Sequence, residues 1–180
     1  MEGVFLILVL FFYLLVRMLF WLRPDERRKD RKRLAPALEL LACRQFAEAL
    51  PLLDAHLAQH PRSVEGLLAR ARCHFEEKEY LLCVADNCKA INQDSHLPQA
   101  YLLKGKAFFA MGHLDEALVE FDRAAWYDRE NPEPYTWRGL VHRQMGQEGK
   151  AYADLQTALR MGDENASFYL RTAAYSGTWR

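Results

Sequence analysis

The side chains best suited to chemistry in this chain are four cysteines and six histidines. A metal site would require Cys73, His74, Cys83 and Cys88 to converge. Cys83 and Cys88 are five residues apart, which places them on different faces of a helix, and the sequence has no C-x-x-C motif. We therefore predict no metal site, and we interpret buried cysteines here as small apolar side chains.

Catalysis also lacks a motif in this sequence. The strings G-x-S-x-G, H-E-x-x-H, G-x-G-x-x-G and the phosphate-binding P-loop are all absent. Lys plus Arg and Asp plus Glu both number 24, so the net charge is zero and no basic surface for nucleic acid is indicated. We predict a protein that is not an enzyme, has no cofactor and has no nucleic-acid partner.

The strongest pattern in the chain is an internal repeat of thirty-four residues. Residues 98–131 contain two amphipathic segments around a turn at 111–113, and residues 132–165 repeat them without a gap. The recurring pairs are Tyr101 and Tyr135, Gly105 and Gly139, Gly112 and Gly146, Ala117 and Ala151, and Ala124 and Ala158. Small residues are needed where helices cross closely, because overpacking costs typically about 1–3 kcal/mol. The period predicts stacked helix pairs and an all-α fold.

Two weaker units, 30–63 and 64–97, extend the same frame backwards. Pro51 lies early in the second helix of the first unit and is expected to shorten or bend it. Asn87 stands where an aromatic residue is usual, so we expect poorer packing around it. Residues 166–180 are expected to form a capping helix and tail that cover the last repeat.

The four units resemble the tetratricopeptide repeat family over residues 30–165. The resemblance implies a solenoid, an α-α superhelix of about four repeats, whose inner face is lined by the first helix of each pair. It places these candidate peptide-groove residues on that face: Leu68, Arg72, Phe75, Leu102, Leu103, Lys106, Phe109, Thr136, Trp137, Leu140 and Arg143.

Such a groove suits a partner segment with acidic and apolar side chains, because aromatic residues and arginine are the usual anchors of binding. The alternative is that Phe75 and Phe109 pack between neighbouring helices and that the cations are solvated. Family members that hold the carboxylate tail of heat-shock chaperones use a clamp of Lys, Asn and Arg. Here the corresponding residues include one cation, so we expect no such role: Leu68, Arg72, Leu103, Glu133 and Trp137.

The N-terminal region has the character of a membrane anchor. Residues 4–22 are apolar except for Arg17, and as a helix they span about 28 Å, close to a hydrocarbon core of about 30 Å. No basic residue precedes this run, and no small-x-small cleavage site follows it, which favours a retained helix over a signal peptide. We predict a stub at 1–3 and a single transmembrane helix in the bilayer at 4–22.

The flanking charge predicts the orientation. Residues 23–33 hold seven basic and three acidic residues, so this juxtamembrane segment should stay in the cytoplasm, with the N-terminus outside. We interpret it as a topology signal and solvated linker, the alternative being a contact with anionic lipid. A bacterial inner membrane is the first expectation, and a mitochondrial outer-membrane import receptor has the same layout.

The sequence therefore predicts a membrane-tethered, non-catalytic adaptor or scaffold that binds a segment of a partner protein at the cytoplasmic face. A second hypothesis is a structural role, in which the chain self-associates into a homo-oligomer within a membrane assembly.

Overall fold

The computed structural model describes residue 13 and residues 26–175. The predicted stub at 1–3 and, apart from Tyr13, the predicted transmembrane helix at 4–22 lie outside the described residues, as does the tail at 176–180. Within residues 26–175 and at residue 13, no helix has both the length and the apolar character needed to cross a membrane.

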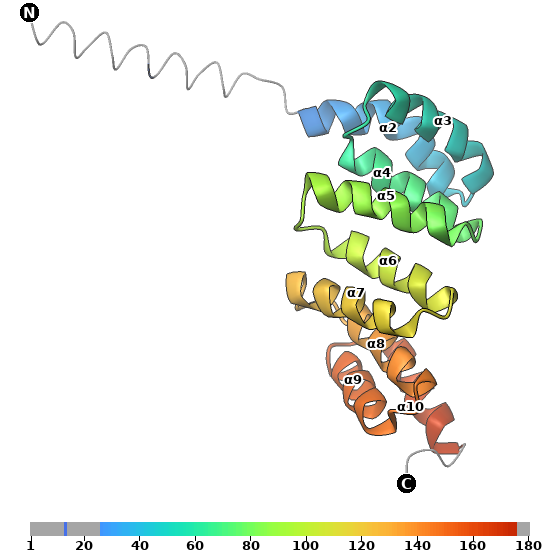
Figure 1. The fold of residues 1–180 in the computed structure, drawn as a ribbon, viewed down its shortest axis with the longest axis vertical. Helices are drawn as coiled ribbons and strands as arrows, with labels where there is room; N and C mark the ends of the chain where they lie inside the picture. Colours follow the sequence, from blue (N-terminus) through green and yellow to red (C-terminus); the bar gives the residue numbers. More distant parts are fainter. Residues whose placement is uncertain (1–12, 14–25, 176–180) are drawn as a thin grey trace, which may run out of the picture.

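The described residues form nine helices and no strand, which confirms the predicted all-α solenoid. Figure 1 shows the helices stacked in sequence order along one long axis. Four antiparallel pairs are followed by a single capping helix. The bounds are α2 (Glu26–Ala42) with α3 (Phe46–Gln59), α4 (Val64–Glu76) with α5 (Tyr80–Gln93), α6 (Pro98–Ala110) with α7 (Leu114–Tyr127), α8 (Glu133–Gln144) with α9 (Glu148–Arg160), and α10 (Glu164–Tyr175).

The close helix crossings explain the small residues of the repeat. A Cβ atom added at Gly105 in α6 would lie 2.7 Å from the ring of Phe121 in α7. A Cβ at Gly139 in α8 would lie 2.9 Å from Leu155 Cγ in α9. Both distances are shorter than carbon contacts allow, and Phe121 and Leu155 are fully buried. Glycine at these positions therefore lets a large apolar side chain fill each pair.

The turn inside each pair requires a left-handed backbone at one recurring position. Gly112 and Gly146 have φ of 81° and 72°, values that glycine adopts without steric cost. The same position in the first two units holds Arg44 and Lys78, with φ of 60° and 65°. A side chain in this region costs roughly 1–2 kcal/mol, so the first two turns are more strained than the last two.

Three local features of the chain had expected structures: Pro51, the segment 23–33 and Asn87. Helix α3 continues through Pro51 and has 14 residues, as many as α5 and α7, so Pro51 does not shorten it. The expected linker at 23–33 is helical from Glu26 onward, because α2 begins there. Asn87 is fully buried; its amide donates to the Cys83 carbonyl at 2.9 Å, while its Oδ1 accepts no hydrogen bond from the described residues.

Candidate functional site

The predicted groove residues come from the first helices of three consecutive pairs, α4, α6 and α8. Three of them are buried and offer almost no surface to a partner: Leu102, Thr136 and Leu140. The Thr136 hydroxyl is engaged as well, since it donates to the Asp163 carboxylate before α10. These three side chains pack the first helices against one another and support the groove from beneath.

The aromatic residues of the groove form a contact between α6 and α8. The Phe109 and Trp137 rings meet edge to face, with centroids 5.7 Å apart, and both side chains are half-buried. Trp137 also stacks on buried Phe121 at 6.3 Å, so its inner face belongs to the core. Phe75 and Leu103 are half-buried within the cluster around Cys83. The aromatic surface is thus anchored in the core, and the rings of Phe109 and Trp137 stay partly exposed.

The positive charge of Lys106, the central cation of the groove, is already neutralised by a neighbouring carboxylate. Lys106 forms an ion pair with Glu133 at the start of α8, and its Nζ lies 5.2 Å from the centroid of the Trp137 ring. The Trp137 indole N–H donates to the same carboxylate at 3.3 Å. Glu133 therefore neutralises Lys106, and the middle of the groove carries an apolar surface with little net charge.

The two outer cations are more available than the central one. Arg72 is exposed and makes no ion pair with any described residue. Arg143 is half-buried, and its guanidinium lies 5.6 Å from the centroid of the Tyr169 ring in α10, with no carboxylate partner in residues 26–175. Arg72 on α4 and Arg143 on α8 are therefore the predicted groove cations best placed to meet an acidic ligand.

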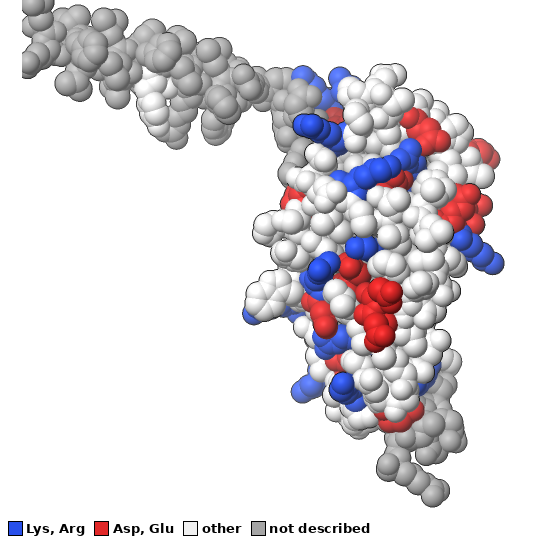
Figure 2. Space-filling view, in the orientation of Figure 1, with Lys and Arg blue, Asp and Glu red and all other residues white. Residues whose placement is uncertain are grey.

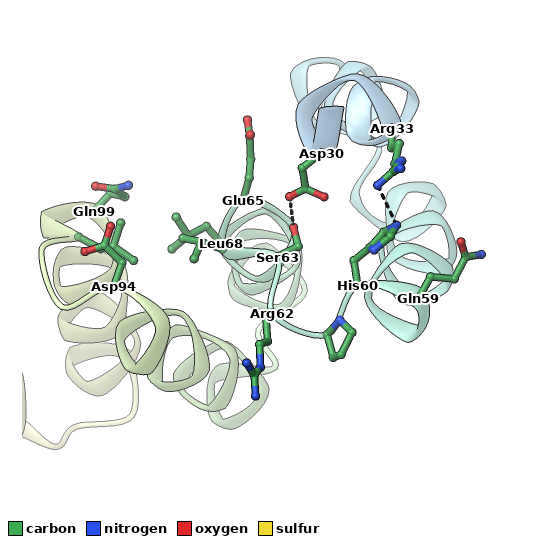
Figure 3. A pocket seen from close by; sticks show the side chains of 13 residues that line it. Asp30, Arg33, Gln59, His60, Arg62, Ser63, Glu65, Leu68, Asp94 and Gln99 are labelled. Carbon is green, nitrogen blue, oxygen red and sulfur yellow. Dashed lines mark hydrogen bonds between the residues drawn. The ribbon is translucent and has the colours of Figure 1, made fainter. Parts of the chain in front are cut away.

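A hollow of about 790 Å³ extends the groove at the end nearest α2. Figure 3 shows Leu68 of α4 pointing toward Gln99 of α6, with Asp30 and Arg33 of α2 on the other side of α4. Of the predicted groove residues, only Leu68 lines it. The sequence pattern did not predict this hollow, because it depends on how the loops between pairs are spaced.

The wall of the hollow is held by polar contacts across two helix pairs. The Ser63 hydroxyl donates to Asp30 at 2.5 Å and accepts from the Gly66 amide at 2.9 Å, which caps α4. His56 Nε2 lies 2.8 Å from Asp30, an ion-pair distance at an angle too bent for a hydrogen bond. Asp30 thus ties the first turns of α2 to the start of α4.

Recurring ion pairs connect the helices on another face. Arg70 in α4 makes a two-pronged contact with Asp86 in α5 at 2.7 and 2.8 Å, and a third bond reaches Asp54 in α3 at 2.7 Å. The hydrogen bonds to Asp86, ahead of those to Asp54, raise the pKa of Arg70 above its ordinary value despite the opposing effect of burial. The guanidinium is therefore charged at every accessible pH.

The same arrangement recurs two units later. Arg138 in α8 holds Asp154 in α9 at 2.5 and 2.8 Å and Asp122 in α7 at 2.6 Å. Between these two, Lys104 in α6 reaches only Glu120 in α7, at 3.1 Å. Figure 2 shows acidic and basic side chains interleaved on the face that it draws. The pairs lock neighbouring helices, and sequence reasoning missed them although each acid follows its base by 16 residues.

Two of the four cysteines, Cys73 and Cys83, lie buried among apolar side chains. Burial raises the pKa of the Cys73 thiol to about 11 and that of the Cys83 thiol to about 12, so both are protonated at neutral pH. Cys88 is half-buried and Cys43 is exposed. No group of three or more metal-ligating side chains occurs in the part of the chain that the structure describes.

Family models match the middle of the chain. A model described as TPR repeat matches residues 105–146, which run from α6 to the turn after α8. A model described as anaphase-promoting complex, cyclosome, subunit 3 matches residues 42–124, from the end of α2 into α7. Together the two models cover all four helix pairs in part.

Solved structures share the fold at low sequence identity. TTC0263, a thermophilic TPR protein of Thermus thermophilus, is 22% identical, with a TM-score of 0.66 over 74% of this chain and 75% of its own. MamA of Desulfovibrio magneticus RS-1 is 14% identical, with a TM-score of 0.69 over 73% and 75%. The first TPR of Spaghetti (RPAP3), solved with an HSP90 peptide, is 17% identical, with a TM-score of 0.59 over 63% and 91%. These likenesses concern the fold.

Proposed function

This chain belongs to the tetratricopeptide repeat family, and we propose that it is a non-catalytic adaptor whose groove binds a segment of a partner protein. We further propose that residues 4–22 anchor it in a membrane, so that the repeats work at the cytoplasmic face. The segment that fits this groove is a peptide with apolar side chains in the middle and acidic side chains on either side.

One observation supports the groove assignment: Phe109 and Trp137 form a partly exposed aromatic contact, and the first helices around it carry Arg72 and Arg143, two cations that lack a carboxylate partner among the described residues. Aromatic and arginine side chains supply most binding energy in protein interfaces. Arginine also binds carboxylates through two parallel hydrogen bonds, which gives direction as well as affinity. Lys106 is already paired with Glu133. We therefore expect acidic side chains of the ligand to bind Arg72 and Arg143 instead.

The partner segment differs from a chaperone tail. The positions that would clamp a terminal carboxylate hold Leu68, Leu103, Glu133 and Trp137 beside the single cation Arg72. The Spaghetti domain was solved with an HSP90 peptide, which supports peptide binding by this fold in general. The chemistry of the present groove favours an internal segment over a free carboxyl end.

The membrane tether rests on the sequence. Residues 4–22 have the length and apolar character of a single span, and the basic excess at 23–33 predicts an outer N-terminus and cytoplasmic repeats. A bacterial inner membrane is the location that we propose. Holding the groove at a membrane raises its effective concentration toward partners on the same membrane without any new contact.

Photo-crosslinking in the native membrane tests the groove. A photoreactive amino acid at Ala110, an exposed position next to Phe109 at the end of α6, should form an adduct with the partner, which mass spectrometry identifies. Arg72→Glu combined with Arg143→Glu should lower the adduct yield about tenfold or more, which corresponds to 1.4 kcal/mol of binding free energy.

Arg160→Glu is the matched control, because Arg160 is an exposed arginine of α9 outside the groove, and it should leave the yield unchanged. Equal yields from the groove variant and the control, with both folded by circular dichroism, would refute the assignment. An adduct with a second copy of this chain would support self-association instead.

Topology reporters test the tether separately. A phosphatase reporter, active only outside the cytoplasm, should be active at the N-terminus and inactive at the C-terminus, and alkaline carbonate should leave the chain in the membrane. Release by carbonate would overturn the tether while leaving the groove assignment intact.

A further inference from the structure

The loops that join one helix pair to the next lie along one edge of the solenoid, which we call the loop edge. It comprises residues 60–63, 94–97 and 128–132 and the helix ends beside them. In Figure 1 the first turn of α2, the α5–α6 loop and the end of α7 all lie on the left side of the molecule. The turns inside the pairs, such as the one between α4 and α5, lie on the opposite side.

The loop edge is the part of the solenoid closest to the proposed anchor. Only residues 23–25 separate the predicted end of the membrane span at Leu22 from the start of α2 at Glu26. Four extended residue steps reach at most about 14 Å. If the anchor is in the bilayer, the start of α2 lies within that distance of the lipid surface. The inference below therefore rests on the proposed tether.

An exposed tryptophan stands on this edge. Trp126, the last residue but one of α7, is 68% exposed, and the Arg129 guanidinium lies 4.8 Å from its ring centroid. An isolated tryptophan on a soluble surface exposes a large apolar area to water. At a membrane its amphipathic ring is favoured at the headgroup level, where tryptophan and tyrosine are enriched.

Aromatic side chains pack around Tyr127, the neighbour of Trp126 at the end of α7. Tyr127 stacks on Tyr101 at a centroid distance of 5.3 Å, and the His96 ring packs edge-on against Tyr127 at 5.3 Å. The Tyr101 hydroxyl donates to the Ser95 carbonyl at 3.1 Å, which fixes the α5–α6 loop to α6. This aromatic stack joins the α5–α6 loop and α6 to the end of α7, the helix end that carries Trp126.

Basic side chains accompany the aromatic ones. Lys32 in α2, Arg62 in the α3–α4 loop and Arg129 in the α7–α8 loop are all exposed. Figure 2 shows Lys and Arg side chains gathered around the start of α2. The loops of the edge also hold three acids, Asp94, Asp128 and Glu130, so the basic excess that attracts anionic lipid lies at the start of α2, and the aromatic contact carries the docking near Trp126.

We propose that the loop edge docks on an anionic lipid surface, with Trp126 at the headgroup level and Arg62 and Arg129 on lipid phosphates. The tether and this edge then give the solenoid two points of attachment. The helix pairs stand on the bilayer side by side, and the groove opens along the membrane toward partners held in it.

Lipid photo-crosslinking on the full chain in nanodiscs tests the docking. A photoreactive residue at Ser95, exposed on the loop edge, is compared with one at Leu81, which is 74% exposed near the start of α5 on the opposite edge. In discs of phosphatidylcholine with phosphatidylglycerol, lipid adducts should form at position 95 and be rare at position 81. Arg129→Glu should lower the yield at 95 about fivefold, the ratio expected for one basic contact with an anionic surface.

The outcomes separate the docking from the tether. A chain that stays in the disc but gives equal yields at positions 95 and 81 overturns the docking alone. A yield at 95 that is unchanged by Arg129→Glu and by Trp126→Ala, or that is as high in pure phosphatidylcholine, overturns the assigned residues and the anionic preference. A chain that does not remain in the disc overturns the tether and, with it, this inference.

Discussion

Ion pairs cross both outer joints of the solenoid, whereas none crosses the middle one among the described residues, and one arginine contact repeats at the two outer joints. We call the contact between consecutive helix pairs a joint. Arg70 crosses the first joint to Asp54 at 2.7 Å, and Arg138 crosses the third to Asp122 at 2.6 Å. At the middle joint the corresponding residues are Lys104 and Cys88, and Lys104 reaches only Glu120 within its own pair.

Apolar packing continues across the middle joint without a break. Ala90 and Ala100 are fully buried there, and Leu97 in the loop between α5 and α6 is nearly so. The three joints therefore share a hydrophobic seam and differ in their ion pairs. Hydrophobic contacts therefore continue through the stack, and we expect the charged contacts to set how firmly each joint resists opening.

The largest effect on the free energy of unfolding is expected from removing the buried carboxylate that joins the two helices of a pair. Asp86 and Asp154 are nearly buried and each holds two nitrogens of an arginine. Asp86→Ala or Asp154→Ala leaves a poorly solvated guanidinium behind and should lower the free energy of unfolding by about 3 kcal/mol. Urea denaturation of the full chain in detergent, followed by circular dichroism, measures the loss.

Glu130→Ala is the control for these variants, because Glu130 is an exposed acid in the loop between α7 and α8 and should leave the denaturation midpoint unchanged. Arg70→Met together with Asp86→Ala removes both charges and should recover part of the loss. A loss as small as that of the control would show that the pairs orient the helices without stabilising them.

A smaller effect of opposite sign is expected at the middle joint. Cys88→Asp places a carboxylate where Asp54 and Asp122 stand in the other joints, opposite Lys104. The new ion pair should raise the free energy of unfolding by about 0.5–1 kcal/mol, since Lys104 is largely buried. Cys88→Ser is the matched control and should give no gain. A gain that persists in the Lys104→Met background would exclude the proposed pairing.

The helix pairs and their close crossings could be predicted from the sequence, because they follow from local periodicity. Gly105 and Gly139 recur at the repeat spacing, and each faces a large side chain of the partner helix. The ion pairs were predictable in principle by the same logic. Basic residues recur at 70, 104 and 138, and an acid follows each by 16 residues.

The repeat could not predict which groove side chains are buried and which are already paired. Leu102 and Leu140 occupy groove positions but are buried, because the twist between pairs turns each first helix against the next. Lys106 is compensated by Glu133, a residue of the following unit whose approach depends on that same twist. Side-chain partners across a joint are set by superhelical geometry, which a single repeat does not contain.

The smallest effect on stability is expected from changing the exposed carboxylate that each arginine contacts across a joint. Asp54 and Asp122 are both 61% exposed, so Asp54→Asn or Asp122→Asn should weaken its own joint by only about 0.5 kcal/mol. Hydrogen exchange followed by mass spectrometry should show roughly twofold less protection in the helices beside that joint, and no change at the other outer joint. The middle joint of the unaltered chain should already exchange at least as fast as these variants, because the variants keep the other ion pairs that cross their joints. If it is instead as protected as the outer joints, the cross-joint ion pairs add nothing to the apolar seam, and the distinction drawn between the joints is wrong.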